Sequence, residues 1–198
     1  MATQQQKTEE TRSRLLQAAF ELLKTAPFSA LTASKITTAA GLSKGALFHH
    51  FSQIEDFYLY MLDSIIQTFD GAIQANSATS FEIFLQTSME ITFEMVENSP
   101  EVFTAIYSFL DLARFKPRYA QKVRAILEAE MEKWKNDLAL YFPPGFSQKR
   151  QEGILYLIDM YFSGLGTHYL VLKNKARYKA ITQEFITMLS RHINGALS

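Results

Sequence analysis

The feature that most constrains this fold is a helical spacing of apolar residues that recurs along almost the whole chain. Apolar residues in stretches such as 15–23 and 57–69 return every three or four positions, which is the period of one helix face. The eight glycines and five prolines mostly separate these stretches, and no alternating β-branched segment interrupts them. The sequence therefore predicts an all-α protein of about nine helices with no sheet.

The predicted helices cover residues 8–25, 33–40, 43–50, from 53 through 69, 81–98, 101–115, 119–141, 148–174 and 178–196. Thr8 and Thr32 are expected to cap the first two helices, and Gly41 is expected to end the second. The clearest boundary is the run Pro143-Pro144-Gly145, because two consecutive prolines cannot continue a helix.

Composition excludes several classes of protein. The chain has 198 residues and no cysteine, which excludes disulfide scaffolds, thiolate nucleophiles and Cys-ligated metals. Its 47% hydrophobic and 20% charged residues are ordinary for a globular protein. No apolar run approaches the roughly 18 residues of a membrane-spanning helix, and the first residues lack the pattern of a signal peptide. We therefore expect a cytoplasmic protein that does not enter a membrane.

Charge is unevenly distributed although the net charge is zero. Residues 1–52 contain six Lys and Arg against three acids, a balance of +3, whereas the remainder contains fourteen against seventeen, a balance of −3. A mildly basic head on a mildly acidic body suggests that the head alone meets a polyanion. We expect two domains, one at 1–52 and one at 53–198.

Residues 31–51 carry the pattern of a helix-turn-helix unit: a short capped helix, a turn at Gly41 and a second short helix. Apolar residues at 36, 40, 42, 47 and 51 are expected to lock the two helices together. The residues left around the start and outer face of the second helix are Ser43, Lys44, Gly45, Ala46, Phe48, His49 and His50. Small residues let this end approach a phosphate backbone, and the hydroxyl, the charge and the imidazoles supply contacts.

This segment has two alternative interpretations: helix packing without DNA binding, and a metal site at His49 and His50. Helix-turn-helix geometry also occurs as plain packing between helices, without DNA. Adjacent His49 and His50 point in different directions on a helix, and no nearby Cys or Asp completes a set of ligands. We therefore expect no metal site and no cofactor.

The head resembles the DNA-binding domain of the tetracycline-repressor (TetR/AcrR) family of bacterial one-component regulators. The resemblance is carried by residues 16–20, 31–32, 36, 39–41, 43–45, 47–51 and 55–57. It implies that Thr32 binds phosphate, that Lys44 and the backbone near Gly45 hold further phosphates, and that residues 48–50 face the major groove. A divergent helical body is also the layout of that family. The resemblance therefore implies a helix-turn-helix DNA-binding domain at 1–52 and a helical effector-binding and dimerisation domain at 53–198.

Two positions depart from the family pattern. Phe48 replaces the usual tyrosine and so lacks a hydroxyl, and Ile54 stands where a lysine is expected before the acidic pair. Each change removes a phosphate contact. We therefore expect sequence-specific binding with a shallow dependence on salt.

The body contains a segment, residues 154–172, that is apolar on nearly all sides and is therefore expected to be buried on both faces. The resemblance implies that this helix and the last one form a four-helix bundle with a second copy. The predicted interface residues are Leu155, Ile158, Leu165, Tyr169, Phe185, Met188, Leu189 and His192. The alternative is that both helices complete a monomeric core.

Aromatic and methionine residues are frequent in the middle helices, as they are both in cores and in ligand pockets. The predicted pocket residues are Phe103, Tyr107, Asp111, Trp134, Asp159, Phe162 and His168. The resemblance implies a small effector here, and the residues favour a largely apolar or aromatic one with one or two polar groups.

The sequence thus favours a homodimeric transcriptional repressor that an effector releases from a near-palindromic operator on double-stranded DNA. A helical protein-interaction module is the alternative. An enzyme is disfavoured, because there is no nucleophile elbow and no clustered carboxylate–histidine set. The sequence names neither the effector, the operator nor the target genes.

Overall fold

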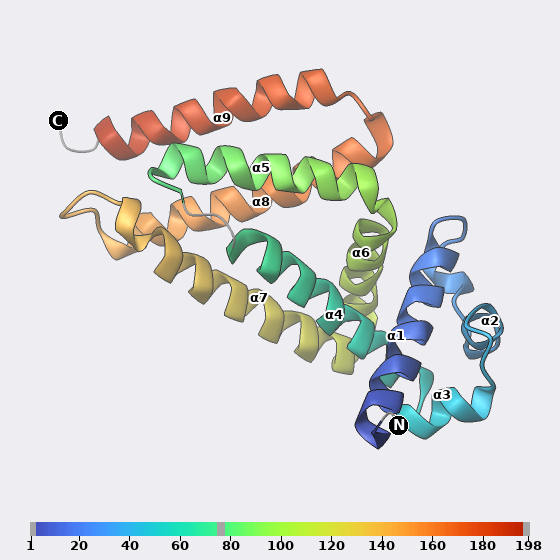
Figure 1. Ribbon diagram of the computed structural model, residues 1–198. Coiled ribbons are helices and arrows are strands. Elements are labelled where there is room, and N and C mark those ends of the chain that lie inside the picture. The colour runs from blue at the N-terminus through green and yellow to red at the C-terminus, as the bar shows by residue number, and fades with distance from the viewer. Residues whose placement is uncertain (1–2, 75–77, 196–198) are drawn as a thin grey trace. The chain divides into compact units, whose positions relative to one another are not determined.

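The computed structural model describes residues 3–74 and 78–195, and in these ranges it contains nine α-helices, two short 3₁₀ helices and no strand (Figure 1). The all-α prediction is confirmed. The helices are α1 Gln4–Leu23, α2 Ala33–Ala39, α3 Lys44–His50, α4 Ile54–Gln74, α5 Phe81–Asn98, α6 Pro100–Phe115, α7 Pro117–Leu138, α8 Gln148–Leu172 and α9 Lys175–Gly195, with 3₁₀ helices η1 at Phe28–Ala30 and η2 at Ala139–Tyr141.

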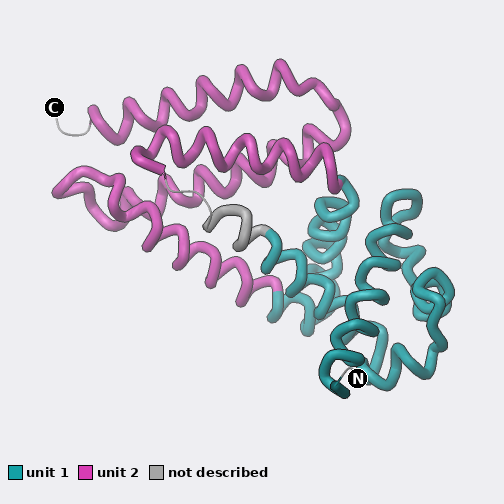
Figure 2. The backbone as a smooth tube through the Cα atoms, in the orientation of Figure 1, with its two compact units in different colours: residues 1–68, 100–122 teal, residues 69–99, 123–198 magenta. Residues whose placement is uncertain are grey.

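The chain divides into two compact units (Figure 2). Unit 1 comprises residues 1–68 and 100–122, and unit 2 comprises residues 69–99 and 123–198. Helices α4 and α7 each begin in unit 1 and end in unit 2. The predicted boundary at residue 52 lies inside unit 1, and the assignment of a function to each side of it stays a prediction.

Helix α1 begins four residues before its predicted start at Thr8. Thr3 is the N-cap: its hydroxyl accepts a hydrogen bond from the Gln6 amide at 3.2 Å, and the Gln6 side chain accepts one from the Thr3 amide at 2.7 Å. This reciprocal pair is a capping box, which satisfies two amides that the helix itself leaves free. At the other end of the chain, the predicted helix end at Ala196 lies outside the described residues.

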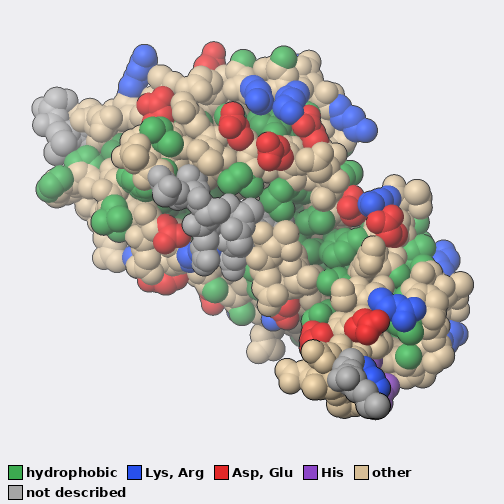
Figure 3. All heavy atoms as spheres, viewed as in Figure 1, with side chains coloured by type: hydrophobic (Ala, Val, Ile, Leu, Met, Phe, Trp, Pro, Cys, Tyr) green, Lys and Arg blue, Asp and Glu red, His purple; other side chains and the backbone are tan. Residues whose placement is uncertain are grey.

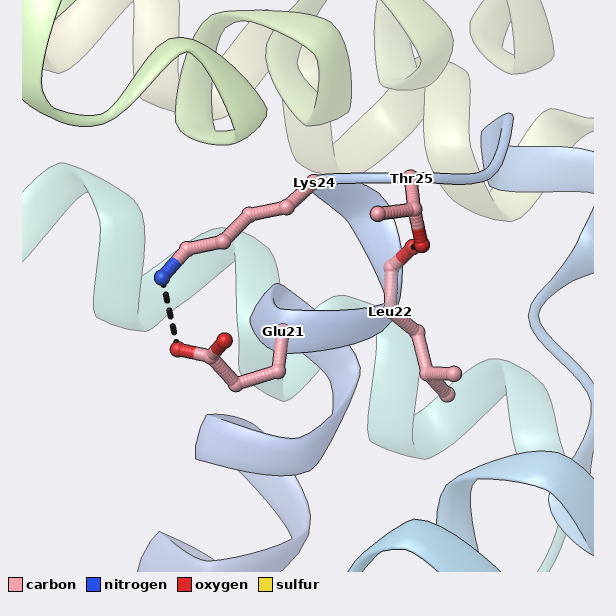
Figure 4. Close-up of polar contacts among 4 residues, drawn as sticks. All are labelled: Glu21, Leu22, Lys24 and Thr25. Atoms are coloured by element: carbon pink, nitrogen blue, oxygen red, sulfur yellow. Dashed lines mark hydrogen bonds and ion pairs between the residues drawn. The ribbon is translucent and has the colours of Figure 1, made fainter.

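The last turn of α1 is drawn in Figure 4. The Lys24 ammonium donates to the Glu21 carboxylate at 2.7 Å, and both groups come from the same turn. The Thr25 and Ala26 amides bond to the Leu22 carbonyl, and Pro27 then prevents the helix from continuing. The 3₁₀ turn η1 at Phe28–Ala30 follows, and the sequence pattern does not predict it.

Unit 1 is built around one apolar core in which α1 packs against α2, α3 and α6. Its most deeply buried side chains are Leu15, Ile36, Leu47, Phe57, Met61, Ile65, Phe109 and Tyr119. Phe28 of η1 contacts the rings of Tyr58 and Phe109, with centroids 5.1 and 5.0 Å apart. The Tyr58 hydroxyl donates to the Leu31 carbonyl at 2.6 Å and so joins α4 to the segment that leads into α2.

Three ion pairs also hold α4 within unit 1. They join Glu55 to Lys116, Asp56 to Arg118 and Asp63 to Lys122. The Arg118 guanidinium, 2.6 Å from Asp56, lowers the pKa of that carboxyl below its ordinary value. The pairs fix the start of α4 against the start of α7, although exposed pairs of this kind each add little stability.

In unit 2, α5 packs against both α8 and α9. The core of this unit contains Phe81, Phe84, Leu85, Leu138, Ile154, Leu155, Ile158, Ile186, Leu189 and Ile193. At the far end of α5, the Glu97 carboxylate accepts hydrogen bonds from the Tyr169 hydroxyl and the Lys175 ammonium. Charges of both signs are interspersed along the edge formed by α9 (Figure 3).

None of the helices in the part of the chain that the structure describes combines the length and apolarity needed to cross a membrane.

Gly41 supplies the first test of this fold. Its φ of 63° is left-handed, which costs a residue with a Cβ about 1–2 kcal/mol. We expect Gly41→Ala to lower the free energy of unfolding by about that amount, measured by urea denaturation. Gly45→Ala is the matched control: it lies inside α3 with ordinary space for a Cβ, so it should leave stability unchanged or raise it. Equal losses in both variants would contradict this account of the turn.

Candidate nucleic-acid interface

Helices α2 and α3 and the turn between them form the predicted helix-turn-helix unit. Thr32 caps α2 by accepting from the Lys35 amide at 3.3 Å, and Ser43 caps α3 by accepting from the Ala46 amide at 3.1 Å. Gly41 adopts the predicted left-handed conformation. The two caps and the turn define where α3 begins and in which direction it leaves.

The inner faces of the two helices meet in the core. Ile36 and Leu47 are completely buried, Phe51 is buried, and Leu42 is half-buried at the turn. Phe51 packs edge-on against Phe57 of α4, with ring centroids 5.4 Å apart. This packing is the apolar wedge that the sequence predicts, and it orients α3 by burying its opposite side.

Arg14 of α1 adds a contact that the sequence analysis missed. Its guanidinium donates to the Ala40 carbonyl at 2.8 Å and so satisfies a free acceptor at the end of α2. The two residues are 26 positions apart in the sequence, so no local pattern predicts this contact. The Arg14 side chain therefore stabilises the turn between α2 and α3.

The outer face of α3 and the start of α2 carry all eight residues that the sequence and the resemblance assign to DNA. Thr32, Ser43, Lys44, Gly45, Phe48 and His49 are exposed, and Ala46 and His50 are half-buried. Phe48 leaves 45% of its surface exposed, which is unusual for a large apolar side chain. These eight residues thus present one cation, two hydroxyl caps, one apolar ring and two imidazoles.

Gly45 has no role in the fold that requires a glycine. It lies in the first turn of α3, and a Cβ there would lie 3.6 Å from the Ser43 hydroxyl, which is an ordinary van der Waals contact. Glycine inside a helix costs about 0.5–1 kcal/mol relative to alanine. A glycine that the fold does not require is consistent with close approach by something outside the chain.

His50 is held mainly in its neutral form near neutral pH. Its partial burial, and after that the nearby His49 and Arg12, lower its pKa from the ordinary value. The His49 and His50 rings meet edge-on with centroids 5.1 Å apart. Arg12 lies over the Phe51 and Tyr60 rings, at 5.5 and 5.6 Å from their centroids. A neutral imidazole offers one hydrogen-bond donor and one acceptor.

The predicted effector residues are divided between the units. Phe103, Tyr107 and Asp111 lie on α6 of unit 1, and the other four lie in unit 2. Two expectations are wrong: Asp111 is exposed and pairs with Arg114 on its own helix, and His168 is exposed on α8, so neither faces an interior. Trp134 and Phe162 do meet, with ring centroids 6.5 Å apart.

The predicted dimer residues also separate into two groups. Leu155, Ile158, Leu165, Tyr169 and Leu189 are buried within the protomer, so their selection as contact residues needs correction. When a helix is apolar on all sides, its sequence does not show which face packs into the core of its own protomer. The apolar residues that stay exposed on α8 and α9 are Tyr156, Leu157, Met160, Val171, Leu172, Ile181 and Met188.

A cavity of about 260 Å³ lies in unit 2, where the start of α5 meets the end of α9. Ser80, Phe81, Glu82, Tyr141, Ser190, Ile193 and Asn194 line it, and no predicted pocket residue is among them. Within residues 3–74 and 78–195, no group of three His, Cys, Asp or Glu side chains is arranged to hold a metal ion.

Comparisons with known proteins support the interpretation of the head. Residues 15–61 match the family described as bacterial regulatory proteins, tetR family. HTH-type transcriptional regulators of Mycobacterium tuberculosis and Mycobacterium bovis, themselves uncharacterized, are 47% identical to this chain over 55 residues. The matched segment spans 28% of this chain and 28% of the length of these curated relatives.

Solved structures extend the likeness to the body. A transcriptional regulator from Rhodococcus superposes with a TM-score of 0.75 at 17% identity, over 93% of this chain and 96% of that chain. The fatty acid degradation regulator FadR from Bacillus halodurans gives 0.74 at 17% identity, over 91% and 94%. At this identity the likeness shows a shared fold. The family match therefore covers the head at residues 15–61, and the chain as a whole shares the fold of these regulators.

Proposed function

We propose that this regulator is a homodimeric repressor that binds a near-palindromic DNA operator through α3 and is released by a small effector. The single observation that carries the DNA-binding part is the outer face of α3, which stays exposed while its inner face is buried. Members of the family are non-enzymatic DNA-binding regulators, in agreement with the expectation that the chain is not an enzyme. A cytoplasmic location follows from this role.

The exposed residues supply two kinds of contact. Lys44 and the amides at the start of α3 suit phosphates, which position a protein on DNA without reading sequence. Phe48 and His49, farther along the exposed face, suit base edges: an apolar ring favours the thymine methyl, and an imidazole can donate or accept. Ser43, Gly45, Ala46 and His50 complete the proposed contact surface, and Thr32 adds a phosphate contact from α2.

A second copy is proposed to cover the exposed apolar faces of α8 and α9. Leu157, Met160, Gly164 and Val171 follow one another at helical spacing on α8, and Met160 and Val171 are 60% and 76% exposed. A Cβ at Gly164 would have nothing within 4 Å, so the fold leaves room there for a neighbouring helix. An isologous dimer would set two α3 helices against successive major grooves.

The proposed dimer surface keeps only some of the interface residues that the sequence predicts. Of the residues chosen from the sequence, Met188 is exposed on the apolar face of α9 and His192 is exposed beside it, and Phe185 is half-buried. Phe185 stacks on Tyr161 of α8, with centroids 3.9 Å apart. The stack joins α8 and α9 within one protomer, which makes their outer faces one surface.

The DNA contacts are tested by selecting a binding site from randomised duplexes and then measuring the affinity of variants for it. We expect Lys44→Ala to weaken binding to all sequences about equally, and His49→Ala to relax preference at particular base pairs by about 1–3 kcal/mol. Gly45→Ala should weaken binding without loss of stability.

Lys24→Ala is the control, since Lys24 is paired with Glu21 at the end of α1. Its affinity should equal that of the wild type. Failure to enrich any sequence, or identical behaviour of the Lys44 and His49 variants, would contradict the proposed division between anchoring and reading.

The dimer is tested by Met160→Glu. A carboxylate at this position would be buried against a second copy, so we expect the dissociation constant of the dimer to rise at least about ten-fold, measured by sedimentation equilibrium. Leu140→Glu is the matched control, because Leu140 is 89% exposed but lies in η2, away from this face. A monomeric wild type, or equal effects of the two variants, would overturn the proposed interface.

A further inference from the structure

We propose that unit 2 binds an amphipathic organic cation, whose apolar body lies against Trp134 and whose ammonium or amidinium group pairs with Asp159. The inference rests on the proposed function, because it names the chemical class of the effector. It assigns to Asp159 the charged contact, to Ser88 a second polar contact, and to the rings around Trp134 the apolar surface.

Trp134 of α7 is the centre of an aromatic cluster built by four elements of unit 2. Its indole meets Phe84 of α5 edge-on, with centroids 6.4 Å apart, and Phe162 of α8 edge-on, with centroids 6.5 Å apart. Phe84 also contacts Tyr141 of η2 at 6.2 Å. Trp134, Tyr141 and Phe162 are only partly buried. Such edge-on rings present faces that attract both apolar groups and cations.

A polar group without a partner lies one turn from this cluster on α5. Ser88 is 5% exposed, and its buried hydroxyl has no hydrogen-bond partner among the residues that the structure describes. Because Ser88 follows Phe84 by four residues, both side chains lie on the same side of α5. A buried hydroxyl with no hydrogen-bond partner destabilises the fold, and a ligand with a donor or acceptor would offset this cost.

Asp159 is the second such group, one turn from the cluster on α8. It is half-buried, and in the described part of the chain it makes no hydrogen bond or ion pair. Phe162 follows it by three residues and so lies on the same side of the helix. Burial alone raises the pKa of Asp159 above its ordinary value. By contrast, Asp56 and Glu97 are each paired with a cation.

The charge of the ligand follows from this contrast. A carboxylate held away from water with no cation beside it is destabilised, and a bound cation removes that cost. A neutral ligand would leave the cost in place, and an anion would increase it. The aromatic faces add attraction for the same sign of charge, because the ring quadrupole is negative over the face.

The test uses Trp134, which is the single tryptophan of the chain, as the reporter. The probes are phenylbutylamine, phenylbutanol and phenylbutyrate, which match in size and differ in charge, and the readout is the change in Trp134 fluorescence. We expect the amine to bind at least about ten-fold more tightly than the alcohol or the acid. Asp159→Asn should remove this preference and leave the affinity for phenylbutanol unchanged.

Glu152→Gln is the matched control, because it removes an exposed carboxylate from the same helix, α8. It should keep the preference for the amine. Thermal unfolding of each variant shows that its fold is retained. Equal affinities for the three probes, no response to any of them, or an unchanged preference in Asp159→Asn would overturn the inference.

Operator binding, measured on the same samples without probe, separates this inference from the proposed function. A wild type that binds its selected operator but does not prefer the amine leaves the DNA-binding proposal in place and overturns only the cationic effector. A preference for the amine in a protein that binds no operator would retain the ligand site and overturn the proposed repressor.

Discussion

The left-handed turn at Gly41 sets the direction in which α3 leaves α2, and the exposed chemistry of the head depends on that direction. Ile36 and Leu47 are completely buried on either side of the turn, so the inner face of α3 cannot rotate outward without exposing a core leucine. Arg14 ties the end of α2 to α1 by bonding to the Ala40 carbonyl. Because the inner face is fixed in this way, Lys44, Phe48 and His49 are presented together on the outside.

Helix α4 connects this arrangement with the rest of unit 1. It begins two residues after Ser52, and its Phe57 ring packs against Phe51. Its residues Glu55 and Asp56 form ion pairs with Lys116 and Arg118 at the start of α7. Tyr58 bonds to the segment that precedes α2. The head is therefore continuous with α4 and with the start of α7, both of which run on into unit 2.

Local chemistry made much of this predictable from the sequence. Thr32, Gly41 and Ser43 each act on neighbours within four residues. Their roles as helix caps and as the turn residue can therefore be predicted from the local sequence. The residues of the proposed DNA-binding surface come from the same pattern, and their contact with DNA stays a prediction. The contact from Arg14 was not predictable, because it depends on packing between α1 and α2 across 26 residues.

The body was predictable only as a set of helices. Residues 154–172 are apolar on nearly all sides, so the sequence could not tell that Leu155 and Ile158 face the protomer core while Leu157 and Met160 face outward. Asp159 and His168 looked equivalent as polar residues in an apolar helix. Packing makes them different: Asp159 is half-buried and has no partner among the described residues, and His168 is exposed.

The most direct test of the central claim is the dependence of operator affinity on salt. The claim is that α3 binds DNA largely through its backbone, Phe48, His49 and His50, with few cations. Lys44 is the one cation among the eight proposed contact residues, and Lys35 is exposed one turn after Thr32 on α2. If both reach phosphates, a dimer would neutralise about four of them, and the logarithm of affinity should fall against the logarithm of salt with a slope of about −4. A slope near −10 would mean that many more phosphates are neutralised and would contradict this account of the interface.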